Sequence, residues 1–141
     1  MKKFIFLFFI VLLVSCEAYP TSSKTSVRQT AEQMEKEEFD RLMKEDSINK
    51  NITVAESLGV LLNEDPNEKK VSLLINNNSE CNIILRFAGE KFYNLPIYKN
   101  NKNFILIEKG TYSLGANLCK ARYSADKTFT DSVTMTLSES D

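Results

Sequence analysis

The sequence predicts a mainly β fold, a small antiparallel β-sandwich preceded by one or two helices. Three observations support this class. From Val71 onward, short runs rich in β-branched and aromatic residues alternate with clusters of Asn, Gly and Lys, as in strands joined by tight turns. Before residue 66 the periodicity is helical and the composition highly charged. About six short strands within residues 71–137 fit an antiparallel sandwich or a small open barrel.

The alternation within these runs predicts which side chains face the core. In "CNIILRFA" one face carries Cys81, Ile83, Leu85 and Phe87. In "KTFTDSVTMTL" the inward face carries Phe129, Val133, Met135 and Leu137, whereas the opposite face holds only Thr and Ser. The run "FYNLPI" is expected at a sheet edge because Pro96 cannot donate to a ladder. The other predicted strands are "VSLLIN", "NFILIE" and "GTYSLGANLCKARYS".

The charged segment from Ser26 to Asn49 predicts a helix. Three acidic-first pairs at i,i+4 spacing support it: Glu32 with Lys36, Glu37 with Arg41, and Asp40 with Lys44. Five residues fall on one half of the helical wheel: Ala31, Met34, Phe39, Leu42 and Met43. Two interpretations stand, a solvated spacer and a coiled-coil or partner-binding helix. The lack of sustained heptads favours a helical spacer over residues 28–66.

A second helix is predicted over residues 53–63. Thr53 and Glu56 form a capping box, with Thr53 as the N-cap. An apolar stripe follows, made of Val54, Ala55, Leu58, Leu61 and Leu62. Such a stripe requires burial, against the following domain or against a partner. Asp65-Pro66 ends the pattern, because a residue before proline avoids the helical conformation.

The N-terminus indicates export to a membrane. Lys2 and Lys3 precede an apolar run of 11 residues, Phe4–Val14, which is too short to span a bilayer and is typical of a signal segment. The sequence Leu13-Val14-Ser15-Cys16 resembles the lipobox of bacterial lipoproteins. The resemblance implies cleavage after residue 15 and a lipid on the sulfur of Cys16, followed by a flexible tether over 16–27. The expected location is a bacterial cell envelope, at the outer membrane, with the face undecided.

Composition excludes several classes of function. The chain has no histidine, which removes Ser-His-Asp and Cys-His catalysis and histidine zinc sites. Without residues 1–15, 16 basic residues face 19 acidic ones, a balance unsuited to nucleic acid. Two cysteines remain after Cys16, too few for a cysteine zinc site, and there is no glycine-rich phosphate loop. We therefore expect no catalytic residue, no metal and no cofactor.

Cys81 and Cys119 are predicted to form a disulfide, since both lie at inward positions of their runs in an exported chain. The bridge would close a loop of about 39 residues and contribute roughly 4 kcal/mol in the chain-entropy model. The alternative is a pair of buried reduced thiols.

Two resemblances extend the fold prediction. The corner "EKGTYSL" resembles corners of immunoglobulin-like and transthyretin-like envelope modules. The segments "INNNSECNIILRFAGEKFYNLPI", "NFILIEKGTYSL" and "LCKARYSADK" together resemble the C-terminal domain of uncharacterised Bacteroidota lipoproteins, over residues 53–137. That group has no assigned activity. It implies possible O-glycosylation at Ser47 and Ser132, each after Asp and before an apolar residue; the alternative is ordinary surface serines.

The expected function is that of a non-catalytic envelope module that binds protein or glycan. The candidate contact loops are "NNNSE", "AGEK" and "YKNNKN", with Tyr93 and Tyr98 as aromatic contacts. One alternative is an enzyme acting on envelope polymers. Its acids would come from Glu80, Glu90, Glu108, Asp126 and Asp131. A second alternative is a subunit of an envelope assembly that docks through helix 53–63.

Overall fold

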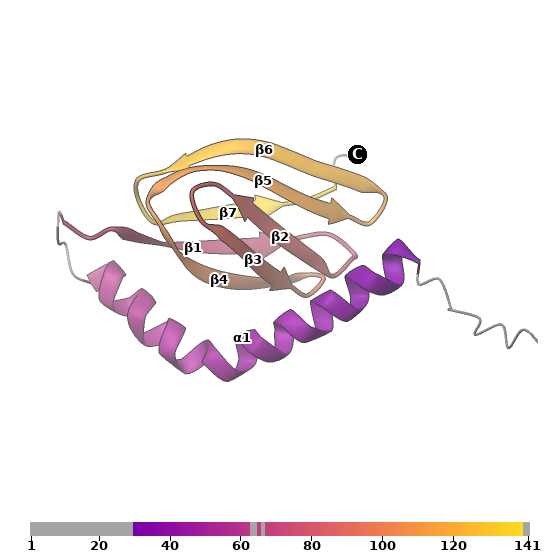
Figure 1. Cartoon of the computed structure of the whole chain (residues 1–141), viewed down its shortest axis with the longest axis horizontal. Helices are drawn as coiled ribbons and strands as arrows, with labels where there is room; N and C mark the ends of the chain where they lie inside the picture. Colours follow the sequence, from indigo (N-terminus) through magenta and orange to yellow (C-terminus); the bar gives the residue numbers. More distant parts are fainter. Residues whose placement is uncertain (1–29, 63–64, 66, 140–141) are drawn as a thin grey trace, which may run out of the picture.

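The computed structural model describes residues 30–62, 65 and 67–139, so Cys16 and the predicted signal and tether lie outside the described residues. One helix precedes seven strands (Figure 1). The elements are α1 (Ala31–Leu62), β1 (Lys70–Asn77), β2 (Ile83–Ala88), β3 (Phe92–Ile97), β4 (Asn101–Glu108), β5 (Gly110–Leu118), β6 (Ala121–Phe129) and β7 (Val133–Leu137).

The strands form two sheets, which confirms the predicted small β-sandwich. The three-stranded sheet has the order β4-β1-β7, and the four-stranded sheet has the order β3-β2-β5-β6. All described pairings are antiparallel except β1 with β7, in which Asn77 lies opposite Leu137. The run with Pro96 is β3, and it does lie at a sheet edge.

The core lies between the sheets and is supplied by alternate residues of both. Ile83, Leu85 and Phe87 are buried as their alternation predicts. They pack with apolar side chains of β1 and β5, and Phe87, Tyr112 and Phe129 form an aromatic cluster with centroid separations of 6.2 to 6.4 Å. Cys81 precedes β2 and is half-buried, so it lies at the end of the sandwich instead of in this core.

Two predicted strands are each interrupted by a turn. The run "GTYSLGANLCKARYS" forms the hairpin β5–β6, with Cys119 and Lys120 as its two-residue turn. Cys119 has a φ of 53°, a conformation that tight hairpin turns normally give to Gly or Asn. The run "KTFTDSVTMTL" also divides, because Phe129 ends β6 and a new strand begins at Val133. Leu137 is buried and Met135 half-buried, but Val133 is exposed.

A single helix of 32 residues replaces the two predicted ones. Thr53 is not its N-cap: it lies inside α1, and its hydroxyl donates to the carbonyl oxygen of Asn49 at 3.2 Å. The capping box is formed instead at the start of α1. The Thr30 hydroxyl accepts from the Gln33 N–H at 3.2 Å, and the Gln33 side chain accepts from the Thr30 N–H at 3.0 Å. Among the described residues, no helix has the length and hydropathy that a membrane span requires.

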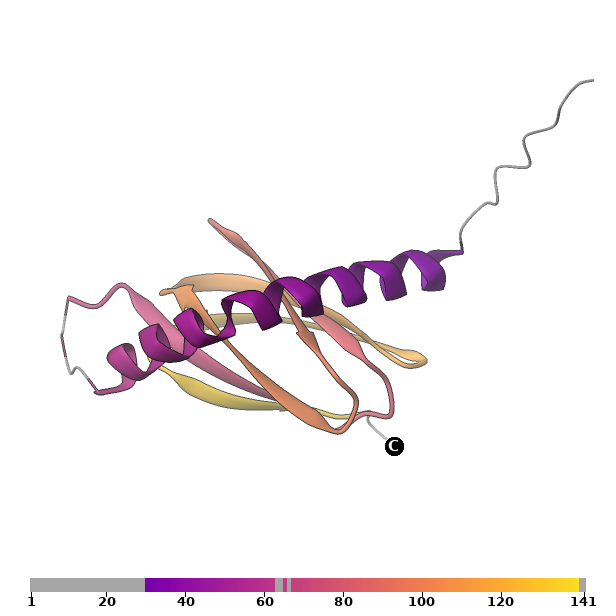
Figure 2. The ribbon, with the colours of Figure 1, turned by 90° about the horizontal axis from the view of Figure 1, so that it is seen from below.

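The first half of α1 packs against the sandwich. Phe39 and Leu42, two residues of the predicted apolar face, are buried against Ile84 on the outer side of β2. The Phe39 ring meets Tyr98 edge-on at 5.3 Å between centroids. The helix contacts β3, β1 and β4, and Figure 2 shows it running across the sandwich. The second half also makes contacts, since the Lys50 ammonium lies over the Phe104 ring, Glu56 pairs with Lys70, and Ser57 is buried. A solvated spacer would lack these contacts, so α1 is part of the folded unit.

The corner at "EKGTYSL" is held by Tyr112. Its hydroxyl donates to the Glu108 carbonyl oxygen at 2.9 Å, and burial raises the pKa of this phenol. Gly89 packs directly against the ring. A Cβ built on Gly89 would lie 2.7 Å from both the Thr111 carbonyl oxygen and Tyr112 Cδ1, closer than atoms in contact normally approach. Glycine is therefore required at position 89 by close packing.

Gly89→Ala should lower the free energy of unfolding by about 1–3 kcal/mol, the usual cost of overpacking. Gly115→Ala is the matched control, since a Cβ there meets nothing within 4 Å. Its change should stay within about 0.5 kcal/mol. Urea denaturation of both variants measures the difference, and equal changes would contradict the packing argument.

Candidate functional site

Two asparagine-rich loops that are distant in sequence meet at one end of the sandwich. The first follows β1 and contains "NNNSE", and the second joins β3 to β4 and contains "YKNNKN". Between them lies a cavity of about 240 Å³ lined by Asn76, Asn78, Asn100, Asn101 and Lys102, which we call the asparagine cavity. Two of the three predicted contact loops thus form one site.

Asn77 holds the walls of this cavity in place. It is fully buried, and its Nδ2 atom donates to the carbonyl oxygens of Cys81 at 2.8 Å and Tyr98 at 3.1 Å. Its Oδ1 atom accepts from the Ser79 backbone N–H at 3.1 Å and from the Ser79 hydroxyl at 2.7 Å. One side-chain amide therefore ties together both loops and the start of β2.

Direct bonds between the loops add to this support. Asn100 donates its backbone N–H to the Ser79 carbonyl oxygen at 3.2 Å and its side-chain amide to Glu80 at 3.1 Å. The φ of Asn100 is 49°, in the left-handed region that asparagine tolerates better than most residues. The cavity is consequently preformed by groups that do not depend on a ligand.

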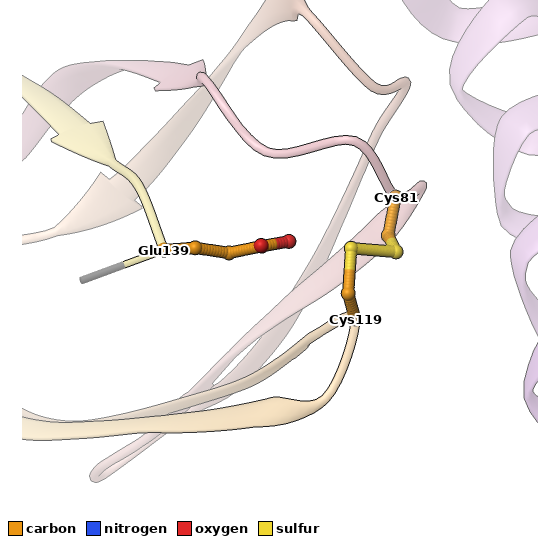
Figure 3. Close-up of side chains that lie close together, drawn as sticks. All are labelled: Cys81, Cys119 and Glu139. Carbon is orange, nitrogen blue, oxygen red and sulfur yellow. A yellow bond between two sulfur atoms is a disulfide. The ribbon is translucent and has the colours of Figure 1, made fainter. Parts of the chain in front are cut away.

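The predicted disulfide is present beside the first loop. Cys81 and Cys119 are joined, with 5.4 Å between their Cα atoms. The bridge links the start of β2 to the β5–β6 turn at the rim of the sandwich, and the side chain of Glu139 points toward it (Figure 3). Because both sulfur atoms are committed to the bridge, these three residues do not supply the thiolates that a zinc site needs.

The lining of the asparagine cavity is suited to hydroxyl groups. Each asparagine amide offers two donor hydrogens and an acceptor oxygen, and Lys102 adds three donors. Asn78, Asn100 and Asn101 are exposed. The Asn100 amide donates to Glu80 and the Asn101 amide oxygen accepts from the Lys102 N–H, so each retains part of its hydrogen-bonding capacity for a ligand. A sugar ring presents adjacent hydroxyls that both donate and accept. The lining therefore matches a glycan better than an apolar molecule.

The remaining predicted contacts lie elsewhere. The loop "AGEK" packs beside the Tyr112 corner, where Lys91 forms an ion pair with Glu108. This hydrogen-bonded ion pair raises the pKa of Lys91. The hydroxyl of Tyr93 accepts from the Glu108 N–H at 3.3 Å, and its ring packs against the core. Tyr98 is 47% exposed but uses part of its ring to contact Phe39.

The acids of the predicted enzyme alternative engage separate partners. Glu80 accepts from Asn100, Glu108 pairs with Lys91, and Asp126 accepts from the Ser113 hydroxyl. Asp131 accepts from the Thr130 hydroxyl and lines a cavity below the end of α1 with Asp65 and Glu68. Glu90, in the "AGEK" loop, lies at the same corner as Glu108, since both carboxylates raise the pKa of Lys91. The other positions belong to different loops and strands.

A family model described as Domain of unknown function (DUF6759) matches residues 32–140. The chain belongs to this family. No curated protein and no solved structure matches the chain. The matched range begins in the first turn of α1 and extends past β7, so the DUF6759 domain includes the helix as well as both sheets.

The DUF6759 domain also has a groove that sequence analysis did not identify. It lies between α1 and the outer face of the four-stranded sheet, has a volume of about 390 Å³, and is lined by charged side chains from both. Arg86 of β2 pairs with Glu38 at 2.6 Å and with Glu35 at 3.7 Å. The only signal in the sequence was an arginine inside the apolar run "IILRFA". Its partners on the helix could not be inferred without knowing that the helix docks there.

The two predicted glycosylation residues have different surroundings. Ser47 is exposed on α1. Ser132 is half-buried, and its hydroxyl oxygen accepts from the Ser72 backbone N–H at 2.9 Å. The Ser132 hydroxyl is thus engaged in a hydrogen bond within the DUF6759 domain, whereas the Ser47 side chain is accessible to a modifying enzyme.

Proposed function

We propose that this chain is a non-catalytic glycan-binding module of the cell envelope, anchored to a membrane by lipid on Cys16. The observation that carries the proposal is the convergence of two asparagine-rich loops on the asparagine cavity. A buried amide, Asn77, keeps the loops in position before any ligand arrives, which lowers the ordering cost of binding.

The proposed ligand follows from the chemistry of the lining. Amide and ammonium groups recognise hydroxyls by hydrogen bonds, and no aromatic side chain is among the described residues that line the cavity. Binding would therefore rest on hydrogen bonds that compete with water, each worth about 0.5–1.5 kcal/mol. A weak interaction with a repeating polymer is the expected mode. The candidate acids come from different loops and strands, and where Glu90 and Glu108 share one corner, Glu108 is engaged in an ion pair with Lys91. This arrangement supports a non-catalytic role.

The anchor is proposed from the sequence Leu13-Val14-Ser15-Cys16. A single acyl chain holds a protein only marginally at a bilayer, whereas two or three chains on one residue give stable attachment. The proposed location is the outer membrane of a bacterial envelope.

Protein extracted from membranes should have an intact mass that corresponds to a chain beginning at Cys16 with added acyl groups. Cys81 and Cys119 should react with an alkylating agent only after reduction, because they are joined. The Cys16→Ala variant should retain residues 1–15 and carry no acyl mass. A wild-type mass equal to that of the unmodified chain would refute the anchor.

Asn78→Ala should weaken binding to envelope glycans about tenfold, since it removes one amide worth about 1.5 kcal/mol from the cavity. Among the described residues Asn78 donates its backbone N–H to the Leu137 carbonyl oxygen at 2.8 Å, a bond that alanine keeps, and its side chain makes no hydrogen bond, so the fold should be unaffected. Asn51→Ala, an exposed asparagine on α1, is the control. Glycan arrays followed by calorimetry measure both variants. If wild-type protein retains no glycan, or both variants bind equally, the proposal fails.

A second function, docking in an envelope assembly, is favoured by one observation. The apolar stripe predicted over residues 53–63 is exposed: Leu58 is 50%, Leu61 55% and Leu62 78% accessible to solvent. These leucines lie on the second half of α1, where the helix does not bury them against its own sandwich. An exposed apolar stripe is typical of an interaction surface.

A photo-cross-linking residue at Leu62 should give a discrete protein adduct in intact cells if this second function holds. The same residue at Lys99, which is exposed on the β3–β4 loop, should give none. Identical patterns from the two positions would exclude docking through the helix.

A further inference from the structure

Strand β6 is an open edge of the four-stranded sheet. Among the described residues, its nine residues pair with β5 alone. The edge strands β3 and β4 lie on the side that α1 contacts, and β7 has only five residues. Figure 1 shows most of β6 away from α1, while its first residues, at Arg122, line the groove beside the helix. A long edge strand leaves a row of backbone groups that another strand can pair with.

The two-residue turn determines which backbone groups face outward. In such a hairpin Leu118 and Ala121, which flank the turn, form a bonded pair, and bonded and non-bonded pairs then alternate along the ladder. Residues 122, 124, 126 and 128 therefore direct their N–H and C=O groups away from β5. The side chains of these four residues are exposed.

The sequence of this edge is complementary to itself. When two β6 strands run antiparallel with Ser124 opposite Ser124, Arg122 of each copy lies opposite Asp126 of the other. Sliding the strands by two residues leaves Arg122 opposite a hydroxyl side chain, Ser124 or Thr128. Sliding them by four places Arg122 opposite Arg122, or Asp126 opposite Asp126. Among the in-phase registers, only the one centred on Ser124 forms two opposite-charge pairs within β6, because the slide that brings Asp126 opposite Lys120 uses a residue of the turn.

The surroundings of Arg122 and Asp126 within one copy are compatible with the register centred on Ser124. Arg122 lines the groove beside α1 that Glu35 and Glu38 also line, but among the described residues it forms no ion pair. Within the same residues, the Asp126 carboxylate accepts a hydrogen bond from the Ser113 hydroxyl. On the inner face of the same register, the half-buried Tyr123 lies opposite the small Ala125. A large side chain beside a small one lets the two strands approach without a clash.

We propose that two copies of this chain associate through β6, joining their four-stranded sheets into one continuous sheet. The ladder between the strands provides the contact, and the two Arg122–Asp126 pairs select the register. Neither residue lines the asparagine cavity, so this inference stands independently of the proposed glycan binding.

The full chain carrying Ser124→Cys, expressed in its own cells and run on a non-reducing gel, tests the register. Directly opposed residues of paired strands have Cα atoms about 5.5 Å apart, within disulfide range. Most of the variant should therefore run as a dimer that reductant separates. Thr128→Cys is the control, because the proposed register places its two copies roughly 27 Å apart, at about 3.4 Å per residue. Wild-type protein, run on the same gel, shows how much dimer forms through the native cysteines alone.

Charge reversal tests the pairing itself. Adding Arg122→Asp to Ser124→Cys should reduce the cross-linked fraction at least roughly fivefold, since it opposes two carboxylates. Adding Asp126→Arg as well should restore the cross-link. Equal cross-linking by Ser124→Cys and Thr128→Cys, or a double reversal that fails to restore it, would overturn the proposal.

Discussion

The buried side-chain amide of Asn77 is the interaction on which the functional end of the molecule depends. Asn77 lies at the end of β1. Its amide donates to the carbonyl oxygen of Cys81, just before β2, and to that of Tyr98 in the β3–β4 loop. A buried polar group left without its partner costs about 1–3 kcal/mol, so losing this amide would leave several such groups unsatisfied at once. The disulfide begins four residues further along the chain, at Cys81, whose carbonyl oxygen accepts from the Asn77 amide.

The strands were predictable because their physical signal is local. Ile83, Leu85 and Phe87 alternate with outward residues, and that alternation is all a strand in a sandwich needs. The β5–β6 turn gave no such signal, since it uses Cys119 and Lys120 where Gly or Asn would mark a hairpin. Its conformation is set by the hairpin ladder that flanks it and by the bridge to Cys81, and the bridge joins residues 38 positions apart in the sequence.

In the helix and the candidate site, too, features with a local signal in the sequence could be predicted, whereas features that depend on distant residues could not. Two capping boxes exist in the sequence, at Thr30 and at Thr53, and only the first is used, because α1 continues unbroken through residues 49–53. The two asparagine loops could be identified as candidate contacts, but not their convergence, which depends on which strands lie side by side. The ion pairs of Arg86 with α1 were likewise inaccessible, since they depend on the docking of Phe39 and Leu42.

The parallel pairing of β1 with β7 has a consequence for how the chain reaches its native state. The first strand of the sandwich needs the last one: Asn77 lies opposite Leu137, and the buried Leu137 side chain completes the core. Contacts between such distant parts of the chain form slowly, because the intervening loop must close first. The three-stranded sheet cannot be completed until the final strand has left the ribosome. The domain therefore remains incompletely folded until nearly all of its residues have been synthesised.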